Sequence, residues 1–145
     1  MNDIDAAPPS PPSVALLTAL LGVAGAFHDR LEKALAEIDL SGAKLGVLSH
    51  LARADEPLPL RALAELQQCG PSNITTLVDR LETAGLVRRD PDPADRRSIR
   101  ASLTPAGRDA ATRGTRVWED VSADFLAGLP AAESAALAQT LARLH

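Results

Sequence analysis

Aromatic residues and cysteine are nearly absent from this chain of 145 residues. It contains two phenylalanines, one tryptophan, no tyrosine and a single cysteine, Cys69. One cysteine cannot form a disulfide within the chain, which excludes a disulfide-stabilised scaffold. Because aromatic side chains are so few, leucine, alanine and valine must fill the core, and this composition favours helices over a β-sandwich.

Signals for a membrane span, secretion, a metal site or a catalytic centre are also missing. We find no run of about 18 apolar residues, so we expect no membrane-spanning helix. The N-terminal segment has no basic stretch before an apolar one, so we expect no secretory signal and a cytoplasmic protein. Neither HExxH or CxxC spacing nor a nucleophile–base pair stands out, so we expect no metal, no cofactor and no enzyme.

The charge is acidic overall but unevenly distributed. The net charge is −4, which argues against a uniformly basic nucleic-acid binder. Residues 80–100 contain six arginines and four acidic residues, so this segment carries +2 and the rest of the chain −6. A locally positive segment on an acidic body fits a protein that contacts DNA along one edge.

The N-terminal part predicts a tail followed by one long helix. Residues 1–13 contain four prolines and are expected to form a disordered tail, ahead of a single domain over residues 14–145. A first helix is predicted from about Ser13 to Ile38. One stripe of this helix recurs in steps of three and four: Val14, Leu17, Leu21, Ala24, His28, Leu31, Leu35 and Ile38. A stripe this long and narrow suggests a partner helix, and hence a homodimer.

Three shorter helices are predicted over the middle of the chain. Ser41 can cap the second helix, and a short third helix covers about residues 60–67. Pro71 opens the fourth, because proline suits the first helical position. Gly85 follows it, where a left-handed residue is needed.

The hydrophobic period then changes from that of a helix to that of a strand. One strand begins at Leu86 and a second covers residues 98–103, joined by the turn-rich segment RRDPDPADRR. Thr104 caps a fifth helix that runs to about residue 127, and a last helix covers about residues 131–144. The fold is therefore predicted to be mainly α with a small β-hairpin.

The third and fourth helices and the charged hairpin together make a winged helix-turn-helix, whose second helix fits the DNA major groove. The candidate contact residues on the fourth helix lie away from its apolar face or on its flank: Ser72, Asn73, Thr75, Thr76 and Arg80. The hairpin arginines can reach phosphates or a minor groove: Arg88, Arg89, Arg96 and Arg97. The alternative is that charges such as Arg88, Arg89, Arg96 and Arg100 are merely solvated, and that Asp79 pairs with a nearby arginine.

Residues 72–108, SNITTLVDRLETAGLVRRDPDPADRRSIRASLTPAGR, resemble the signature segment of the MarR family. The pieces TxLVDRLExxGLVxR, DPxDRR and LTxxGR occur in order. The resemblance implies a winged helix-turn-helix lobe (41–104) between dimerisation helices (14–39 and 105–145). It also implies a dimer that reads a pseudo-palindrome in double-stranded DNA, with the wings in minor grooves. Many relatives carry arginine where this chain has Thr76, so a major-groove arginine contact is not implied at this position.

The resemblance also assigns roles in the wing and suggests regulation. Asp95 would hold the hairpin tip and Arg97 would enter the minor groove. The protein would be a repressor released by a small aromatic or phenolic effector, oriented by His28, Asp29 and Arg30.

Alternatives remain for several of these interpretations. His28 can instead be a histidine packed at a helix seam. Cys69 can be a redox sensor or simply a small packed thiol. The whole module can be a winged helix that binds protein rather than DNA.

Overall fold

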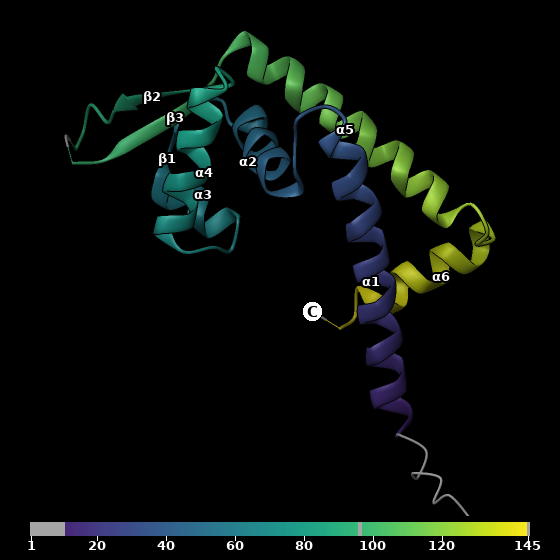
Figure 1. Ribbon diagram of the computed structural model, residues 1–145. Coiled ribbons are helices and arrows are strands. Elements are labelled where there is room, and N and C mark those ends of the chain that lie inside the picture. The colour runs from purple at the N-terminus through teal and green to yellow at the C-terminus, as the bar shows by residue number, and fades with distance from the viewer. Residues whose placement is uncertain (1–10, 96, 145) are drawn as a thin grey trace, which may run out of the picture.

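The computed structural model describes residues 11–95 and 97–144 as a mainly helical chain with a small antiparallel sheet (Figure 1). Its elements are α1 Pro12–Ala36, α2 Gly42–Arg53, β1 Leu58–Pro59, α3 Leu60–Leu66, α4 Pro71–Thr83, β2 Val87–Pro91, β3 Ile99–Leu103, α5 Pro105–Leu126 and α6 Ala131–Leu141. In Figure 1, α2, α3, α4 and the sheet form a lobe, and α5 leads away from it toward α6 and packs against α1. The predicted fold class is confirmed.

The N-terminal helix α1 corrects one prediction. It is long and apolar enough to cross a membrane, judged by length and composition alone, contrary to the expectation that no such segment exists. The reason is that no charged residue occurs between Pro12 and His28, although Thr18 and small residues interrupt the apolar run. Only Leu31 and Leu35 of this helix are buried, so its N-terminal half is left uncovered by the rest of this chain.

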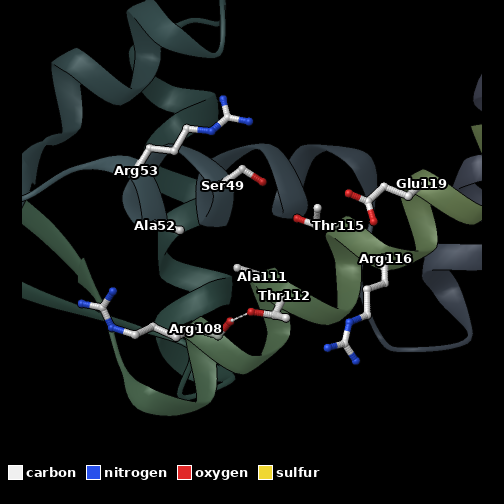
Figure 2. Close-up of a pocket in the computed structure, with 9 residues that line it drawn as sticks. All are labelled: Ser49, Ala52, Arg53, Arg108, Ala111, Thr112, Thr115, Arg116 and Glu119. Carbon is white, nitrogen blue, oxygen red and sulfur yellow. Dashed lines mark hydrogen bonds between the residues drawn. The ribbon is translucent and has the colours of Figure 1, made fainter.

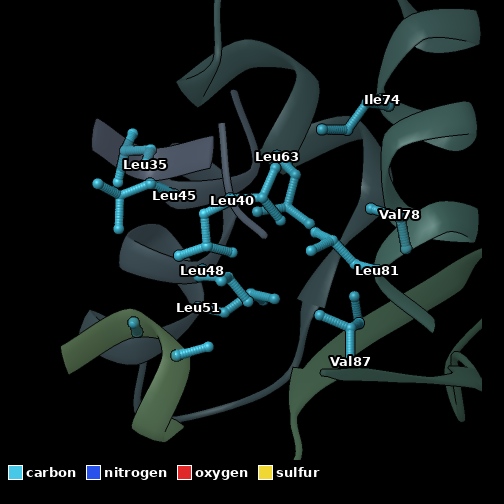
Figure 3. Packing of buried hydrophobic residues seen from close by; sticks show 14 of the residues in the cluster. Leu35, Leu40, Leu45, Leu48, Leu51, Leu63, Ile74, Val78, Leu81 and Val87 are labelled. Atoms are coloured by element: carbon cyan, nitrogen blue, oxygen red, sulfur yellow. The ribbon is translucent and has the colours of Figure 1, made fainter. Parts of the chain in front are cut away.

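The core of the lobe is aliphatic and is built where helices α1 to α5 meet the sheet (Figure 3). The predicted cap of α2 is present, since the Ser41 hydroxyl accepts a hydrogen bond from the Lys44 backbone N–H at 3.3 Å. The fully buried side chains come from α1 to α4: Leu35, Val47, Leu48, Leu63, Ile74, Val78 and Leu81. The burial of Ile74, Val78 and Leu81 turns one face of α4 inward, so its opposite face points to solvent.

The sheet has one strand more than the predicted hairpin. Strand β3 lies in the centre, with β2 and β1 on either side, both antiparallel to it. Strand β1 consists of Leu58 and Pro59 alone, and two residues are too few to show a periodic pattern. Its pairing with β3 ties the connection before α3 to the base of the wing.

The junction between β3 and α5 is held by a cap and a close contact. The Thr104 hydroxyl donates to the Gly85 carbonyl at 2.7 Å and accepts from the Gly107 backbone N–H at 3.0 Å. A Cβ atom at Gly107 would lie 1.9 Å from the Leu86 carbonyl oxygen, which no side chain can occupy without movement of the backbone. The glycine of the LTxxGR motif is therefore required by the approach of α5 to the end of α4.

Helix α1 is fastened to α5 by aromatic contacts. The Phe27 ring packs edge-on against both Trp118 and Phe125, with ring centroids 5.4 Å apart in each pair. Such edge-to-face pairs contribute about 0.5–1.5 kcal/mol each beyond their buried area. All three aromatic residues of this chain therefore lie at the contact between α1 and α5.

We expect the Gly107→Ala variant to lose about 1–3 kcal/mol of unfolding free energy, because the added methyl group forces the β3–α5 junction apart. Urea denaturation followed by circular dichroism measures this loss. Gly128→Ala is the matched control, since a Cβ there meets nothing within 4 Å. Equal midpoints for the two variants would show that the junction tolerates the separation.

Candidate nucleic-acid interface

Helix α4 presents the predicted polar face to solvent. Ser72, Asn73, Thr75, Thr76 and Arg80 are all exposed, whereas Ile74, Val78 and Leu81 are buried on the opposite side. Pro71 occupies the first turn, where its missing N–H removes no hydrogen bond. The helix therefore stands on the lobe with its N-terminal turns accessible to a partner.

The hydroxyl groups on this face are partly committed within the helix. Thr75 donates to the Pro71 carbonyl at 2.9 Å, and Thr76 donates to the Ser72 carbonyl at 3.0 Å. Beside them lies a cavity of about 440 Å³ lined by Ala43, Gln67, Cys69, Asn73, Thr76, Leu77 and Arg80. The half-buried Cys69 thus lies next to three of the predicted contact residues.

The tip of the wing is held by two aspartates. The Asp95 carboxylate accepts from the Arg97 backbone N–H at 3.0 Å, and its carbonyl accepts from the Ser98 N–H at 2.8 Å. This arrangement supports the predicted role of Asp95. Residue Arg96 lies outside the described residues.

Asp92 is a second tip residue, which the sequence analysis missed. It is only 6% exposed, accepts from the Ala94 N–H at 2.9 Å, and forms an ion pair with Arg100 at 2.8 Å. The Arg100 guanidinium and the Ala94 N–H hold the pKa of Asp92 below its ordinary value. Its signal was the first aspartate of DPxDRR, whose pairing across the hairpin cannot be seen without the register of β2 and β3.

Arg89 joins the wing to helix α4. Its guanidinium pairs with Glu82 at 2.6 Å and with Asp79, and its backbone N–H donates to Glu82 at 3.2 Å. The Arg89 hydrogen bond holds the pKa of Glu82 below its ordinary value. Asp79 therefore has an arginine partner as predicted, and it is Arg89. An arginine held in this way is positioned to fix the angle between wing and helix.

The other predicted wing arginines differ in whether a carboxylate of the chain pairs with them. Arg88 pairs with Asp90 at 2.8 Å, and both side chains are largely exposed, so the pair contributes little stability. Arg97 forms no ion pair among the residues that the structure describes. Of the described wing arginines, Arg97 is thus the one whose charge is not opposed by a carboxylate within the chain.

The predicted effector residues on α1 are not among the residues that line the cavity between α2 and α5. His28, Asp29 and Arg30 are exposed, and the Arg30 guanidinium lies over the Phe125 ring, 5.2 Å from its centroid. That cavity has a volume of about 590 Å³ (Figure 2). Its lining is Ser49, Ala52, Arg53, Arg108, Ala111, Thr112, Thr115, Arg116 and Glu119. The sequence carried no signal for it, because two helices separated along the chain contribute its residues.

A short helix, an exposed polar helix and a charged hairpin in this order define a winged helix-turn-helix, a class of DNA-binding proteins. A family model described as "MarR family" matches residues 38–98. The uncharacterized HTH-type transcriptional regulator YdcH of Bacillus subtilis is 27% identical over 104 residues, which cover 70% of this chain and 71% of YdcH. Two other curated transcriptional regulators match over 51% and 48% of their own length.

Solved structures share the fold over nearly the whole chain. A MarR family regulator from Rhodococcus sp. RHA1 has a TM-score of 0.79 and 26% identity, covering 92% of this chain and 95% of that one. A mutant MarR from E. coli complexed with operator DNA has a TM-score of 0.79 and 23% identity, covering 91% and 94%. BpsR of Bordetella bronchiseptica, whose DNA binding is regulated by 6-hydroxynicotinic acid, has a TM-score of 0.76 and 22% identity, covering 90% and 98%.

Over residues 38–98 the chain matches the MarR family of DNA-binding transcriptional regulators, and it shares the fold of solved MarR family regulators over about nine-tenths of its length. The predicted role of a regulator rather than an enzyme is that of the matched family. Because the matched structures cover about nine-tenths of the chain, the apolar helix α1 is accounted for as part of this fold.

We expect the Glu82→Gln variant to be less stable than the parent at pH 7, because it removes a charged partner of Arg89. The pKa of Glu82 is lower in the folded protein than its ordinary value of 4.5. Its contribution is therefore present above that pH and is lost as the pH falls through the folded pKa. The difference in urea midpoint between parent and variant should shrink as the pH is lowered to about 3.

Glu65→Gln on the exposed side of α3 is the control, and its midpoint should follow the parent at each pH. A difference between parent and Glu82→Gln that is the same at about pH 7 and about pH 3 would show that the charge of Glu82 is irrelevant to stability.

Proposed function

We propose that this protein is a ligand-responsive repressor that binds a pseudo-palindromic operator as a homodimer in the cytoplasm. The observation that carries the proposal is the exposed polar face of α4 beside a wing whose Arg97 is unopposed. The mutant E. coli MarR with the same fold is complexed with operator DNA, which supports the same use of α4 here. Residues 41–104 act as the DNA-binding lobe, and residues 14–39 and 105–145 as the dimer body.

In this proposal α4 enters the major groove and the wing enters the adjacent minor groove. Ser72, Asn73, Thr75 and Thr76 face base edges from the first two turns. Arg97 is presented to a minor groove by the turn that Asp95 and Asp92 hold. The binding of an arginine in a minor groove depends on the width of the groove and on the density of phosphate charge, rather than on individual bases.

We expect Arg97→Ala to weaken binding to operator and random duplex by similar factors, and to lower the slope of log K against log salt by about 1. Fluorescence anisotropy over a series of salt concentrations measures both. Arg88→Ala is the control with a smaller expected effect, because Asp90 already opposes that charge. Parent-like binding by Arg97→Ala at about 150 mM salt would contradict the wing assignment.

The dimer body is proposed from apolar surface that this chain leaves uncovered. Most of the large exposed apolar side chains gather on the N-terminal half of α1 and around α5 and α6, whereas Leu66 and Ile99 lie on the lobe. The first group comprises Val14, Leu16, Leu17, Leu21, Val23, Trp118, Leu126, Leu137 and Leu144. Helix α6 contributes no buried residue to the described chain. Exposed apolar area of this extent is typical of a protein–protein interface, and a second copy supplies the same faces.

Light scattering at micromolar concentration should give the mass of a dimer, with an interface on the order of 2,000 Å² or more. Leu17→Glu combined with Leu21→Glu should shift the mass to that of a monomer, because both side chains would be charged within the proposed interface. A monomeric parent protein would refute the dimer.

Regulation by a ligand is proposed at the cavity between α2 and α5, together with His28, Asp29 and Arg30 on the neighbouring α1. Helix α2 belongs to the lobe and α5 leads into the dimer body, so a ligand between them can change the spacing of the two α4 helices. The two α4 helices must lie about 34 Å apart to enter successive major grooves. Arg53, Arg108 and Arg116 in the lining suit an anionic aromatic ligand. The regulation of BpsR by 6-hydroxynicotinic acid supports this class of effector.

We expect an aromatic carboxylate or phenol to release the protein from DNA at up to about millimolar concentration, provided that it binds the released state more tightly. Arg53→Ala should raise the concentration that releases half of the DNA, and His28→Ala tests the contribution of α1. Release by no compound of a panel of such ligands would refute an effector of this class.

A further inference from the structure

The first two turns of α4 carry a distinctive set of hydrogen-bonding groups. We infer that they select A·T base pairs at the positions they face, with threonine methyl groups against thymine methyl groups. The inference rests on the proposed function, because it assumes that α4 lies in a major groove. It goes beyond that function by naming the bases that the helix reads.

The argument starts from the two threonine hydroxyls. A hydroxyl group has one proton to donate and two lone pairs that accept. Thr75 and Thr76 give that proton to the carbonyls of Pro71 and Ser72, at 2.9 and 3.0 Å. What each threonine offers outside the helix is therefore an acceptor oxygen and a methyl group.

Base edges in the major groove differ in what they can match. Guanine presents two acceptors, N7 and O6, which an acceptor oxygen cannot satisfy. An A·T pair presents the adenine N6 donor and the thymine methyl group, which match both groups that the threonines offer. In a G·C pair the only group that can match an acceptor oxygen is the cytosine N4 donor, and there is no methyl group. The two threonines therefore favour A·T over G·C.

The side chain of Asn73 also favours an A·T base pair. Its carboxamide combines one acceptor and one donor group, which match adenine N6 and N7 in a bidentate pair, whereas guanine requires two donors. The side chain is exposed and lines the same hollow as Thr76. Two kinds of side chain on one face thus converge on A·T.

The basic side chains that would favour guanine are placed elsewhere. No lysine or arginine occurs within residues 71–78, all of which the structure describes. Arg80 lies four residues beyond Thr76, which is about 6 Å along the helix axis, and base contacts come mainly from the N-terminal residues of such a helix. Arg89 is turned back onto Glu82 and Asp79. Arg80 is therefore assigned to phosphate.

Selection of binding sites from a random DNA library with the full-length protein tests the inference. The expected result is enrichment of A·T pairs, with thymine methyl groups in the major groove, at the half-site positions under α4. Guanine at those positions would overturn the inference while leaving the proposed function intact. Failure to enrich any sequence would overturn the proposed function itself.

Replacement of the selected thymines by uracil isolates the methyl contact without altering the protein. Each uracil that removes a contacted methyl group should weaken parent binding roughly fourfold, the equivalent of one buried methylene. Thr76→Ser keeps the hydroxyl but has no methyl group, so it should bind alike two probes that differ only in thymine or uracil at the position facing Thr76. Thr76→Val keeps a methyl group and should retain the preference for thymine. Equal binding of both probes by the parent would overturn the inference.

Two further variants complete the test. Thr76→Arg places a guanidinium that suits guanine N7 and O6, and the selected base at that position should change to guanine. Thr83→Ser is the matched control, because Thr83 makes the same bond to the carbonyl four residues before it, at 2.9 Å, but lies at the last turn of α4. It should leave both the selected sequence and the response to uracil unchanged. A change in selected sequence with Thr83→Ser as large as that with Thr76→Ser would overturn the inference.

Discussion

The burial of one face of α4 is the constraint on which the rest of this structure depends. Ile74, Val78 and Leu81 lock the helix against an aliphatic core, and this packing leaves the opposite face to solvent. An exposed helix of 13 residues would be only marginally helical by itself. The lobe therefore supplies the rigidity that a recognition element needs. The polar residues on the exposed face of α4 contribute nothing to the core.

The wing takes its position from ion pairs as well as from the apolar packing of Val87 and Ala101 in the core. The ion pairs of Arg89 fasten the first strand to α4, and the pair of Arg100 with Asp92 fixes the tip. Among the described arginines of the wing, Arg97 is the one that forms no ion pair within the chain. A net charge of −4 for the chain is compatible with DNA binding, because Arg97 lies at the exposed end of the hairpin.

Helix α5 connects the two ends of the molecule. Its first turn is pressed onto the lobe at Gly107, and its later turns hold α1 through the Phe27 contacts. A rigid helix of 22 residues thus connects the DNA-binding face to the apolar surface of α1 and α6. The cavity between α2 and α5 lies beside this helix, at its lobe end.

The amino-acid sequence by itself determined the order of the elements, their caps and the exposed face of α4, because these depend on contacts between residues near one another in the chain. Local chemistry was sufficient to predict the caps at Ser41 and Thr104, the glycine at position 85 and the buried stripe of α4. The tertiary structure alone decided which arginines are free, that Asp92 supports the wing tip and that β1 completes the sheet. Each of these depends on the register or packing of segments far apart in sequence, as in the pairing of Leu58 with Ala101, and no local pattern encodes such a distance.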